Sequence, residues 1–228
     1  MKKIALAFLF LSILSCSTNE GWEDLFNGKD LSGWHVYNGV GQANGWYVDD
    51  GVLVFDPTLR TDASNASLIS DNTYKDFELS IDWMISTNGN SGLFWSVKED
   101  TAYAFPYQTG PEIQMLDDNW KEYIEARGNI QRAGSLFNVL APNQWVSNPA
   151  GEWNTYLLHI NQSKNEGWLD FNGVRVLEFP VNGQEWMELI GPTPFADWPE
   201  FGTTQTGHIG LQDHGAKVAF RRIQLRAL

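Results

Sequence analysis

Cysteine is almost absent from the 228-residue chain, because Cys16 is its only one. A single cysteine cannot form a disulfide within the chain, so packing and hydrogen bonds have to hold the fold together. Basic residues are also scarce: 15 lysines and arginines stand against 28 aspartates and glutamates, and the net charge is −13. Nucleic-acid phosphates are bound through lysine and arginine, so the sequence predicts no nucleic-acid partner.

A long apolar run is missing at the N-terminus. The run at residues 4–14 is too short to cross a bilayer as a helix. Two lysines precede this run and Ser15-Cys16 follows it, which is typical of a secretory signal. The residues at 13–16 resemble a bacterial lipobox, in which the cysteine is lipidated. We therefore expect a lipoprotein signal peptide at 1–15, lipidation of Cys16, a tether at 16–21 and a lipid anchor in the bacterial cell envelope, in the periplasm or at the cell surface. A plain signal peptide with an incidental cysteine is the alternative.

Apolar and aromatic residues are abundant, at 43% and 14% of the chain, and eleven of them are tryptophan. This composition predicts a sizeable core in one domain, residues 22–228. Many short alternating stretches separated by Gly, Asn and Pro turns, with no convincing helical period, predict an all-β sandwich.

The alternation of apolar and polar residues is clearer in some of the expected strands than in others. The clearest alternation is at 77–85, with every second residue apolar, and Asp50-Gly51 and Asn172-Gly173 are favoured hairpin turns. In the stretch 91–97, Leu93, Trp95 and Val97 are expected to share one face. Two short strands are expected within 45–55, on either side of Asp50-Gly51, and further strands at 68–70, 133–140, 153–160, 167–176 and 218–225, the last with a bulge between Phe220 and Ile223.

Two strand-like stretches carry polar residues on one face and apolar residues on the other. In the first, Ile113 and Met115 alternate with Glu112 and Gln114. In the second, near the C-terminus, Ile209 and Leu211 face one way, and His208, Gln212 and, if the strand continues, His214 face the other. Hydrogen-bonding side chains on an apolar element cost desolvation unless a ligand uses them, so these two stretches predict a site across one face of a sheet.

The irregular segments supply candidates for sugar contacts. Trp120, Trp186 and Trp198 lie outside the expected strands and are the preferred stacking residues, whereas Trp95 is expected in the core. Asp117 is a candidate polar contact to substrate, with capping of a turn as its structural alternative. The long excursion at 185–202 is expected to serve function or to cover something.

Six blocks, taken together and in order, resemble the 3-keto-disaccharide hydrolase family of the concanavalin A-like lectin and glucanase superfamily. They are Leu25–Trp34, Gly89–Phe94, Gly110–Asp117, Arg132–Leu136, Gly151–Asn154 and Leu211–Gly215. The resemblance implies a concanavalin A-like jelly-roll sandwich of two antiparallel sheets. It also implies cleavage of glycosides oxidised at C3, by hydrolysis or by C1–C2 elimination followed by hydration, and members look metal-assisted.

Such chemistry needs a base near C2 and donors or a cation at the enolate oxygen that develops at C3. Glu112 or His214 is the expected base, and Gln114, Gln212 and Arg132 are the expected donors. A divalent metal held by Glu112 and His214 would suit the enolate, although no strong metal-spacing motif is present. One residue cannot readily be both free base and ligand.

Other interpretations remain open. Glu112 and Asp117 resemble the carboxylate strand of sandwich-fold glucanases, but Gln114 replaces one acid, and the two carboxylates have opposite parity. A non-catalytic carbohydrate-binding module would use the same fold. Glu112 could instead be paired with Arg132 for structure. His208 is expected to be a structural histidine.

Overall fold

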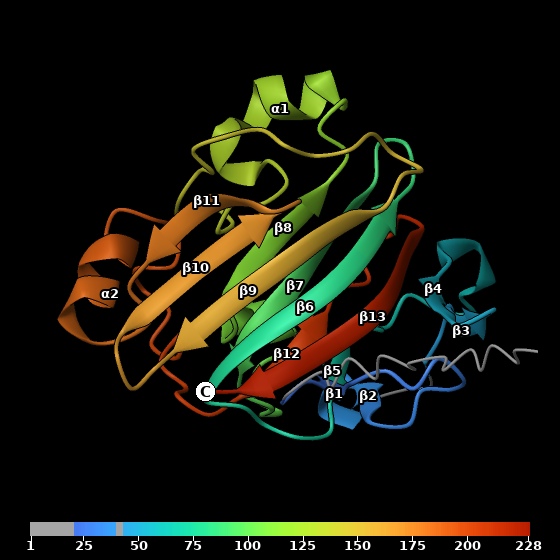
Figure 1. The fold of residues 1–228 in the computed structure, drawn as a ribbon, viewed down its shortest axis with the longest axis horizontal. Helices are drawn as coiled ribbons and strands as arrows, with labels where there is room; N and C mark the ends of the chain where they lie inside the picture. The colour runs from blue at the N-terminus through green and yellow to red at the C-terminus, as the bar shows by residue number, and fades with distance from the viewer. Residues whose placement is uncertain (1–20, 40–42) are drawn as a thin grey trace, which may run out of the picture.

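Two antiparallel β-sheets pack face to face in the computed structural model, which describes residues 21–39 and 43–228 (Figure 1). This architecture confirms the predicted all-β sandwich. The expected signal peptide and Cys16 lie outside the described residues. Within the described part, none of the helices has the length and apolar character needed to span a membrane.

The large sheet has eight strands in the order β11-β10-β9-β6-β13-β4-β3, with β1 pairing onto β13. Its strands are β1 (Glu23–Asp24), β3 (Trp46–Asp49), β4 (Val52–Phe55), β6 (Asp76–Ile85), β9 (Asn154–Asn161), β10 (Glu166–Phe171), β11 (Val174–Phe179) and β13 (Val218–Ala227). Its β3–β4 and β10–β11 hairpins confirm both predicted turns.

The small sheet has five strands in the order β2-β5-β12-β7-β8. They are β2 (Trp34–Val36), β5 (Leu68–Ser70), β7 (Asn90–Val97), β8 (Glu112–Leu116) and β12 (His208–Leu211). β8 carries the first polar stretch and β12 begins the second. Because both strands pair with β7, the two polar stretches belong to one sheet although they are far apart in the chain.

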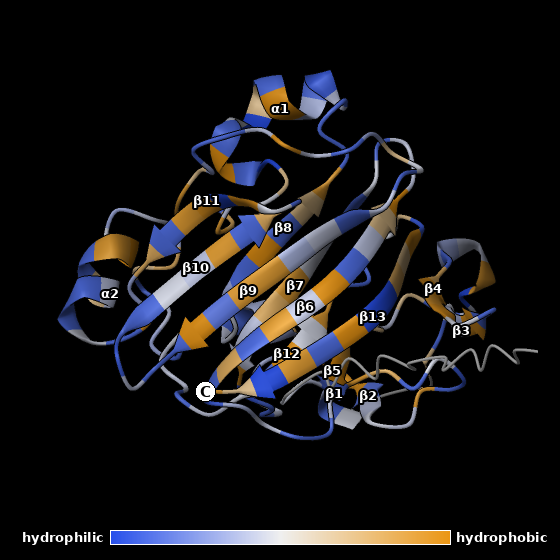
Figure 2. Cartoon of the chain, viewed as in Figure 1, coloured by the Kyte–Doolittle hydropathy of each residue, from blue (hydrophilic) through white to orange (hydrophobic). Residues whose placement is uncertain are grey.

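Alternation along β6 confirms which side chains enter the core. Phe77, Leu79, Ile81, Trp83 and Ile85 are buried between the sheets, and the alternating bands on the strands of the large sheet are visible in Figure 2. The acids on the other face of β6 are buried too, because arginines of β13 cover them: Arg226 pairs with Glu78, and Arg221 with Asp82.

Bulges change the direction of two strands. In β13 the register shifts between Arg221 and Gln224, as expected from the slip in the apolar pattern. In β7 an unexpected bulge occurs at Ser96, whose φ is 54°. Val97 is therefore not on the face of Leu93 and Trp95, and the predicted common face was wrong for Val97. It packs with Phe94 in a second apolar cluster on the other side of the small sheet.

The predicted strand at 133–140 is wrong. Leu136 forms only isolated bridges, to Ile113 and Leu140. The chain cannot stay extended here, because Gly134 and Asn138 adopt positive φ angles of 78° and 57°.

Among residues 21–39 and 43–228 the sandwich also carries two short helices that the sequence pattern did not indicate, α1 (Lys121–Arg127) and α2 (Gly183–Ile190). Four 3₁₀ turns accompany them: η1 (Tyr37–Gly39), η2 (Pro57–Leu59), η3 (Pro106–Gln108) and η4 (Asn129–Gln131). In α2 the buried face consists of Trp186 and Ile190, one helical turn apart. Helices of about two turns are too short to give a clear 3.6-residue period in a sequence.

Candidate active site

The outer face of the small sheet carries a row of polar side chains across three neighbouring strands. In β8, Ile113 and Met115 enter the core, so Glu112 and Gln114 project from the opposite face. Gln114 pairs with Gly92 of β7, and the backbone N–H of Gln212 donates to the Gly92 carbonyl at 3.0 Å. The strand pairing therefore brings Gln114 and Gln212 to either side of Gly92.

A cavity of about 230 Å³ lies over this row. Glu112, Gln114, Gln212 and His214 form its polar part, and Asn90 of β7 joins them. The three aromatic side chains that complete the lining, Tyr107, Phe137 and Phe195, come from segments outside the strands. The expected role of the 185–202 excursion as a cover is confirmed for Phe195, which is part of this wall.

Glu112 is buried, with 7% of the residue exposed, and its carboxyl group makes no ion pair in the part of the chain that the structure describes. Its Oε1 has no hydrogen-bond partner there, and its Oε2 accepts only a long hydrogen bond of 3.5 Å from Nε2 of Gln212. Burial raises the pKa of Glu112 to about 8, because the charged form is desolvated without compensation. At neutral pH the group is therefore mainly protonated.

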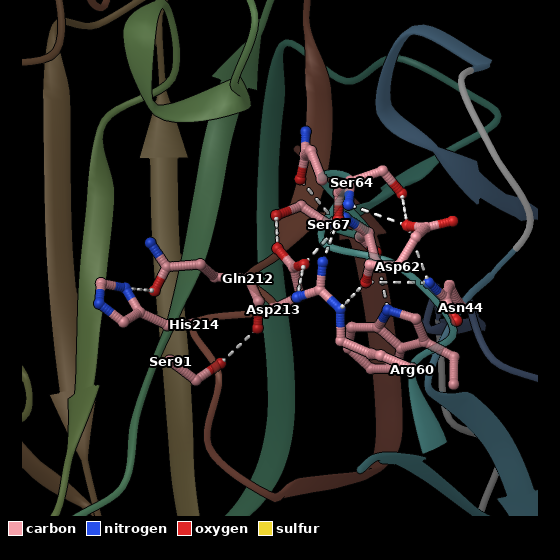
Figure 3. Close-up of polar contacts among 12 residues, drawn as sticks. Asn44, Arg60, Asp62, Ser64, Ser67, Ser91, Gln212, Asp213 and His214 are labelled. Atoms are coloured by element: carbon pink, nitrogen blue, oxygen red, sulfur yellow. Dashed lines mark hydrogen bonds and ion pairs between the residues drawn. The ribbon is translucent and has the colours of Figure 1, made fainter. Parts of the chain in front are cut away.

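His214 is linked to Glu112 through Gln212, and Figure 3 shows the contact between Gln212 and His214. Since Nε2 of Gln212 faces the Glu112 carboxyl group, Oε1 of Gln212 faces His214 and accepts from Nδ1–H at 3.2 Å. This arrangement leaves the lone pair of the His214 ring on Nε2. Burial lowers the pKa of His214 below its usual value, with the Asp213 carboxylate opposing the shift. The imidazole is thus neutral, and basic at Nε2, at pH 7.

Asp213 fixes the backbone that carries these two side chains. Its side chain points away from the Gln212–His214 pair, as Figure 3 shows, and accepts hydrogen bonds from Ser67 at 2.6 Å and from Arg60 at 3.2 Å. The Ser91 hydroxyl donates to the Gln212 carbonyl at 2.8 Å. Although β12 ends at Leu211, these bonds hold residues 212–214 in place beside β7.

Gln114 is held by a chain of amide and hydroxyl groups that leads to α1. Its Nε2 donates to Asn90 at 3.2 Å, and the hydroxyl of Tyr123 lies 3.5 Å from the Asn90 amide and donates to Gln131 at 2.8 Å. The Oε1 atom of Gln114 is buried without a hydrogen-bond partner among the described residues. Two orphaned oxygens, on Glu112 and Gln114, therefore lie at one cavity, which fits a ligand that supplies hydroxyl donors.

A family profile described as the 3-keto-alpha-glucoside-1,2-lyase-like domain matches residues 21–226. The chain belongs to this family. A 3-keto-disaccharide hydrolase of Bacteroides thetaiotaomicron is 29% identical over 232 residues, covering 92% of this chain and 79% of that protein. A crystal structure of a candidate glycosyl hydrolase from Parabacteroides distasonis superposes with a TM-score of 0.82 at 32% identity, over 92% of this chain and 95% of that one.

The jelly-roll sandwich of the family is shared more widely. The carbohydrate-binding module CBM66 of Bacillus subtilis superposes with a TM-score of 0.52 at 10% identity, over 87% of this chain and 98% of that one. At this identity the likeness concerns the fold alone. The predicted concanavalin A-like class is confirmed, whereas function has to be argued from the site.

Arg132, one of the expected donors, is not among the residues that line the cavity. Its guanidinium group lies 4.8 Å from the centre of the Trp145 ring, and its Nε donates to Asn129 at 3.1 Å. The suggested Glu112–Arg132 ion pair is likewise not formed. Arg132 directly follows the 3₁₀ turn η4, and its role as a donor to substrate is not supported by this geometry.

The three tryptophans that were expected to stack on a sugar do not line the cavity. Trp186 is 1% exposed, packs at 5.8 Å on Trp95 and donates from its indole nitrogen to the Phe201 carbonyl, so it belongs to the core. Trp120 packs on Tyr123 at 4.8 Å at the start of α1 and does not line the cavity. Trp198 lies behind the cavity wall, 6.1 Å from Tyr107.

Asp117 caps a turn, which was the structural alternative considered for it. Its carboxylate oxygens accept from the backbone N–H groups of Asn88 at 2.9 Å and Asn119 at 3.0 Å. Its role as a substrate contact is therefore not supported by the geometry. His208 bonds the Ser70 carbonyl at 2.6 Å and lies outside the cavity lining, as expected for a structural histidine.

The donor set for a divalent metal has two members here. Glu112 and His214 both line the cavity, but no third histidine, cysteine, aspartate or glutamate joins them among residues 21–39 and 43–228. Catalytic zinc, for comparison, is usually held by three protein ligands. A cation held by Glu112 and His214 therefore stays a prediction of the sequence.

Proposed function

We propose that this protein is a carbohydrate-active enzyme that cleaves the glycosidic bond of 3-keto-glycosides, by C1–C2 elimination followed by addition of water. The family match and the relative named a 3-keto-disaccharide hydrolase support a carbohydrate-cleaving role. The observation that carries the proposal is that Glu112 and His214 line one cavity and are bridged by Gln212, where burial raises the pKa of the acid and lowers that of the imidazole. Such a divergence assigns an acid and a base.

In the first half-reaction Nε2 of His214 removes the proton on C2, which the neighbouring C3 ketone has made acidic. The C2–H electrons form the enolate, which collapses with formation of the C1–C2 double bond. The C1–O bond to the aglycone breaks, and Glu112 donates its proton to the leaving oxygen. Glu112 is then a carboxylate and His214 an imidazolium.

Hydration reverses these two roles. The Glu112 carboxylate takes a proton from water as the water oxygen bonds to C1, and the His214 imidazolium returns a proton to C2. The products are the free 3-keto sugar and the alcohol of the aglycone, and both side chains regain their starting protonation. Gln212 contacts both groups, so its amide can orient the His214 ring and keep Nε2 as the atom that takes the proton and returns it.

Two alternative functions are less well supported. A two-carboxylate glycosidase needs a second carboxyl group, but Glu112 is the only carboxyl-bearing side chain in the lining of this cavity. Asp213 lies nearby, but its oxygens are occupied by Arg60, Ser67 and the Ala66 N–H. A binding module would not need an acid held protonated by burial beside a neutral imidazole.

The decisive experiment is incubation of the protein with 3-keto-glucosides while aglycone release is measured. We expect release by the wild type and a loss of about 10²–10⁴-fold in Glu112→Gln and in His214→Ala, typical of removing an acid or base. The matched control is Glu166→Gln, an exposed acid of β10, which should retain the wild-type rate. No release from any 3-keto substrate, with binding of glycans retained, would overturn the enzyme proposal in favour of a binding module.

We also propose that the protein acts in the bacterial cell envelope through a lipid on Cys16, supported by the Ile13–Cys16 pattern. Metabolic labelling with a fatty acid would detect the lipid, and Cys16→Ala should abolish the label. Label retained in this variant would contradict the anchor.

A further inference from the structure

The amide of Gln114 is oriented by a chain of hydrogen bonds that runs from the cavity to α1 and η4. Nε2 of Gln114 donates to Oδ1 of Asn90 at 3.2 Å, and Nδ2 of Asn90 lies 3.5 Å from the Tyr123 hydroxyl. This hydroxyl donates to Oε1 of Gln131 at 2.8 Å, and Nε2 of Gln131 donates to Oδ1 of Asn138 at 2.6 Å. Each member of the chain therefore donates away from the cavity.

This direction leaves a hydrogen-bond acceptor at the cavity. Oε1 of Gln114 is buried and has no hydrogen-bond partner among residues 21–39 and 43–228, and Gln114 belongs to the cavity lining. An amide oxygen accepts hydrogen bonds and cannot donate them, so the ligand has to supply a donor here. The sequence predicts a donor to substrate at Gln114, whereas the atom that the structure leaves free is an acceptor.

Burial turns this oxygen into a means of discrimination between ligands. Only 1% of Gln114 is exposed. When a substrate fills the cavity, solvent no longer reaches the oxygen, and a buried acceptor without a partner costs free energy. A site built to bond a hydroxyl group therefore rejects an analogue that lacks it.

The catalytic acid and the Gln114 amide contact different positions along β7. The Glu112 carboxyl group occupies the space over Gly92. The Gln114 amide is instead bonded to Asn90, two residues from Gly92 in the same strand. An antiparallel strand rises about 3.4 Å per residue, so about 7 Å separate the two positions. Substrate groups that contact Glu112 and Gln114 therefore lie at opposite ends of a sugar ring.

The chemistry of the proposed substrate identifies the group at the Gln114 end. In the mechanism above, the oxygen on C1 contacts Glu112 and the hydrogen on C2 is removed by His214. The carbon opposite C1 in a pyranose ring is C4, which carries a hydroxyl group. The neighbouring C3 carries the ketone oxygen, which is an acceptor and cannot bond to Oε1 of Gln114. The donor that Gln114 requires is therefore the C4 hydroxyl.

We propose that Gln114 determines specificity by accepting a hydrogen bond from the C4 hydroxyl of the 3-keto ring, and that Tyr123 is a positioning residue that orients the Gln114 amide. The assignment rests on the function proposed above. Tyr123 is not among the residues that line this cavity, so it acts through Asn90. Its ring packs on Trp120 with centroids 4.8 Å apart, which holds the hydroxyl in place.

The test compares two substrates that differ by one oxygen atom, methyl 3-keto-glucoside and its 4-deoxy analogue. Both have the same ketone and the same leaving group. The proteins are the wild type, Gln114→Met, Tyr123→Phe and the control Gln184→Met. Methionine has nearly the length of glutamine but lacks the amide acceptor, and Gln184 is exposed on α2 and lies outside the cavity lining. Circular dichroism would show that each variant is folded.

We expect the wild type to prefer the substrate with the C4 hydroxyl about 10–100-fold in kcat/KM, typical of a buried acceptor left unpaired by the analogue. Gln114→Met should lose this preference and use both substrates at similar rates, whereas Gln184→Met should keep it. Tyr123→Phe should reduce the preference, mainly through a higher KM for the hydroxylated substrate, while the pH profile of kcat stays that of the wild type.

Equal use of both substrates by the wild type, or a preference that Gln114→Met retains, would overturn the assignment of Gln114 and leave the proposed function intact. A full preference in Tyr123→Phe would overturn its positioning role. If Gln114→Met does not fold, the preferences of the wild type and of Tyr123→Phe decide the proposal. No turnover of either substrate by the wild type would instead overturn the proposed function, and this assignment with it.

Discussion

The Glu112 carboxyl group occupies the space that a side chain at position 92 would fill, because a Cβ added at Gly92 would lie 2.0 Å from Oε1 of Glu112. Gly92 is in β7 and Glu112 in β8, and the carboxyl group leans across the glycine toward Gln212. The absence of a side chain at position 92 is therefore what allows a buried acid to lie flat on the outer face of the sheet.

Gly92→Ala should displace the Glu112 carboxyl group and lower kcat for aglycone release by at least about tenfold, because proton transfer requires hydrogen-bond contact. Circular dichroism would show whether the variant keeps the β-sandwich. The control is Gly191→Ala at the end of α2, where the added Cβ meets its nearest neighbour at 3.2 Å. A folded Gly92→Ala protein with full activity would show that the position of Glu112 is unimportant.

Glu112→Gln should stabilise the protein at neutral pH. The folded protein keeps Glu112 protonated up to a pKa of about 8, above the usual value of 4.5. Between those pH values the folded state binds more protons than the unfolded state, so stability falls as the pH rises. Glutamine removes this penalty, and the free energy of unfolding should increase by about 3 kcal/mol at pH 7 and change little at pH 4. Urea titrations at the two pH values would measure it, and an equal effect at both would contradict the raised pKa.

The pH dependence of kcat/KM distinguishes the acid from the base. If His214 is the base, activity should rise as the pH increases through its pKa, which lies below the usual 6.5. If Glu112 is the acid, activity should fall as the pH increases through about 8. A bell-shaped profile is expected. A rate that instead rises through pH 8 would reverse the assignment and make Glu112 the base.

Chelation should leave the reaction unaffected, since the proposed mechanism assigns both proton transfers to side chains. We expect the rate of aglycone release with EDTA to stay within about twofold of the rate without it. If a metal took part in catalysis, its removal would raise the activation barrier and slow the reaction much more. Loss of activity that Mg²⁺ or another divalent cation restores would contradict this expectation. It would support the metal site that the sequence suggests at Glu112 and His214.

Trp186→Ala should destabilise the fold without acting on sugar recognition. The indole ring is fully buried against Trp95, and deleting a large buried aromatic side chain costs about 3–5 kcal/mol. Thermal melting would show a large drop in Tm, while the KM of the remaining folded protein should be unchanged. A raised KM with an unchanged Tm would return Trp186 to the list of sugar contacts.

Alternation in the sequence was enough to predict the polar side of the site. A period of two fixes the face on which Glu112 and Gln114 project, and the same reasoning applies to Gln212. The bulge at Ser96 shows the limit of this reasoning, because one extra residue moved Val97 to the opposite face. The residue types around position 96 carry no clear signal of that bulge.

The aromatic walls could not be predicted in the same way. Tyr107 lies in the short 3₁₀ turn η3 and Phe195 in a loop, and the paths of such segments depend on tertiary contacts rather than on a local period. Tryptophan is common both in sandwich cores and in sugar sites, so composition did not separate Trp186 from a stacking residue. The position of Arg132 could not be predicted either, because it follows the 3₁₀ turn η4 and does not lie in a strand with a period of two.

The position of β13 has a consequence for how the molecule is assembled. This strand is formed by the last residues of the chain, yet it lies between β6 and β4 in the interior of the large sheet. Until those residues are available, β6 and β4 have no shared partner, and both present open edges. The two halves of the large sheet can join only after residues 218–227 have been made, so a chain shortened before residue 218 would lack the strand that connects them.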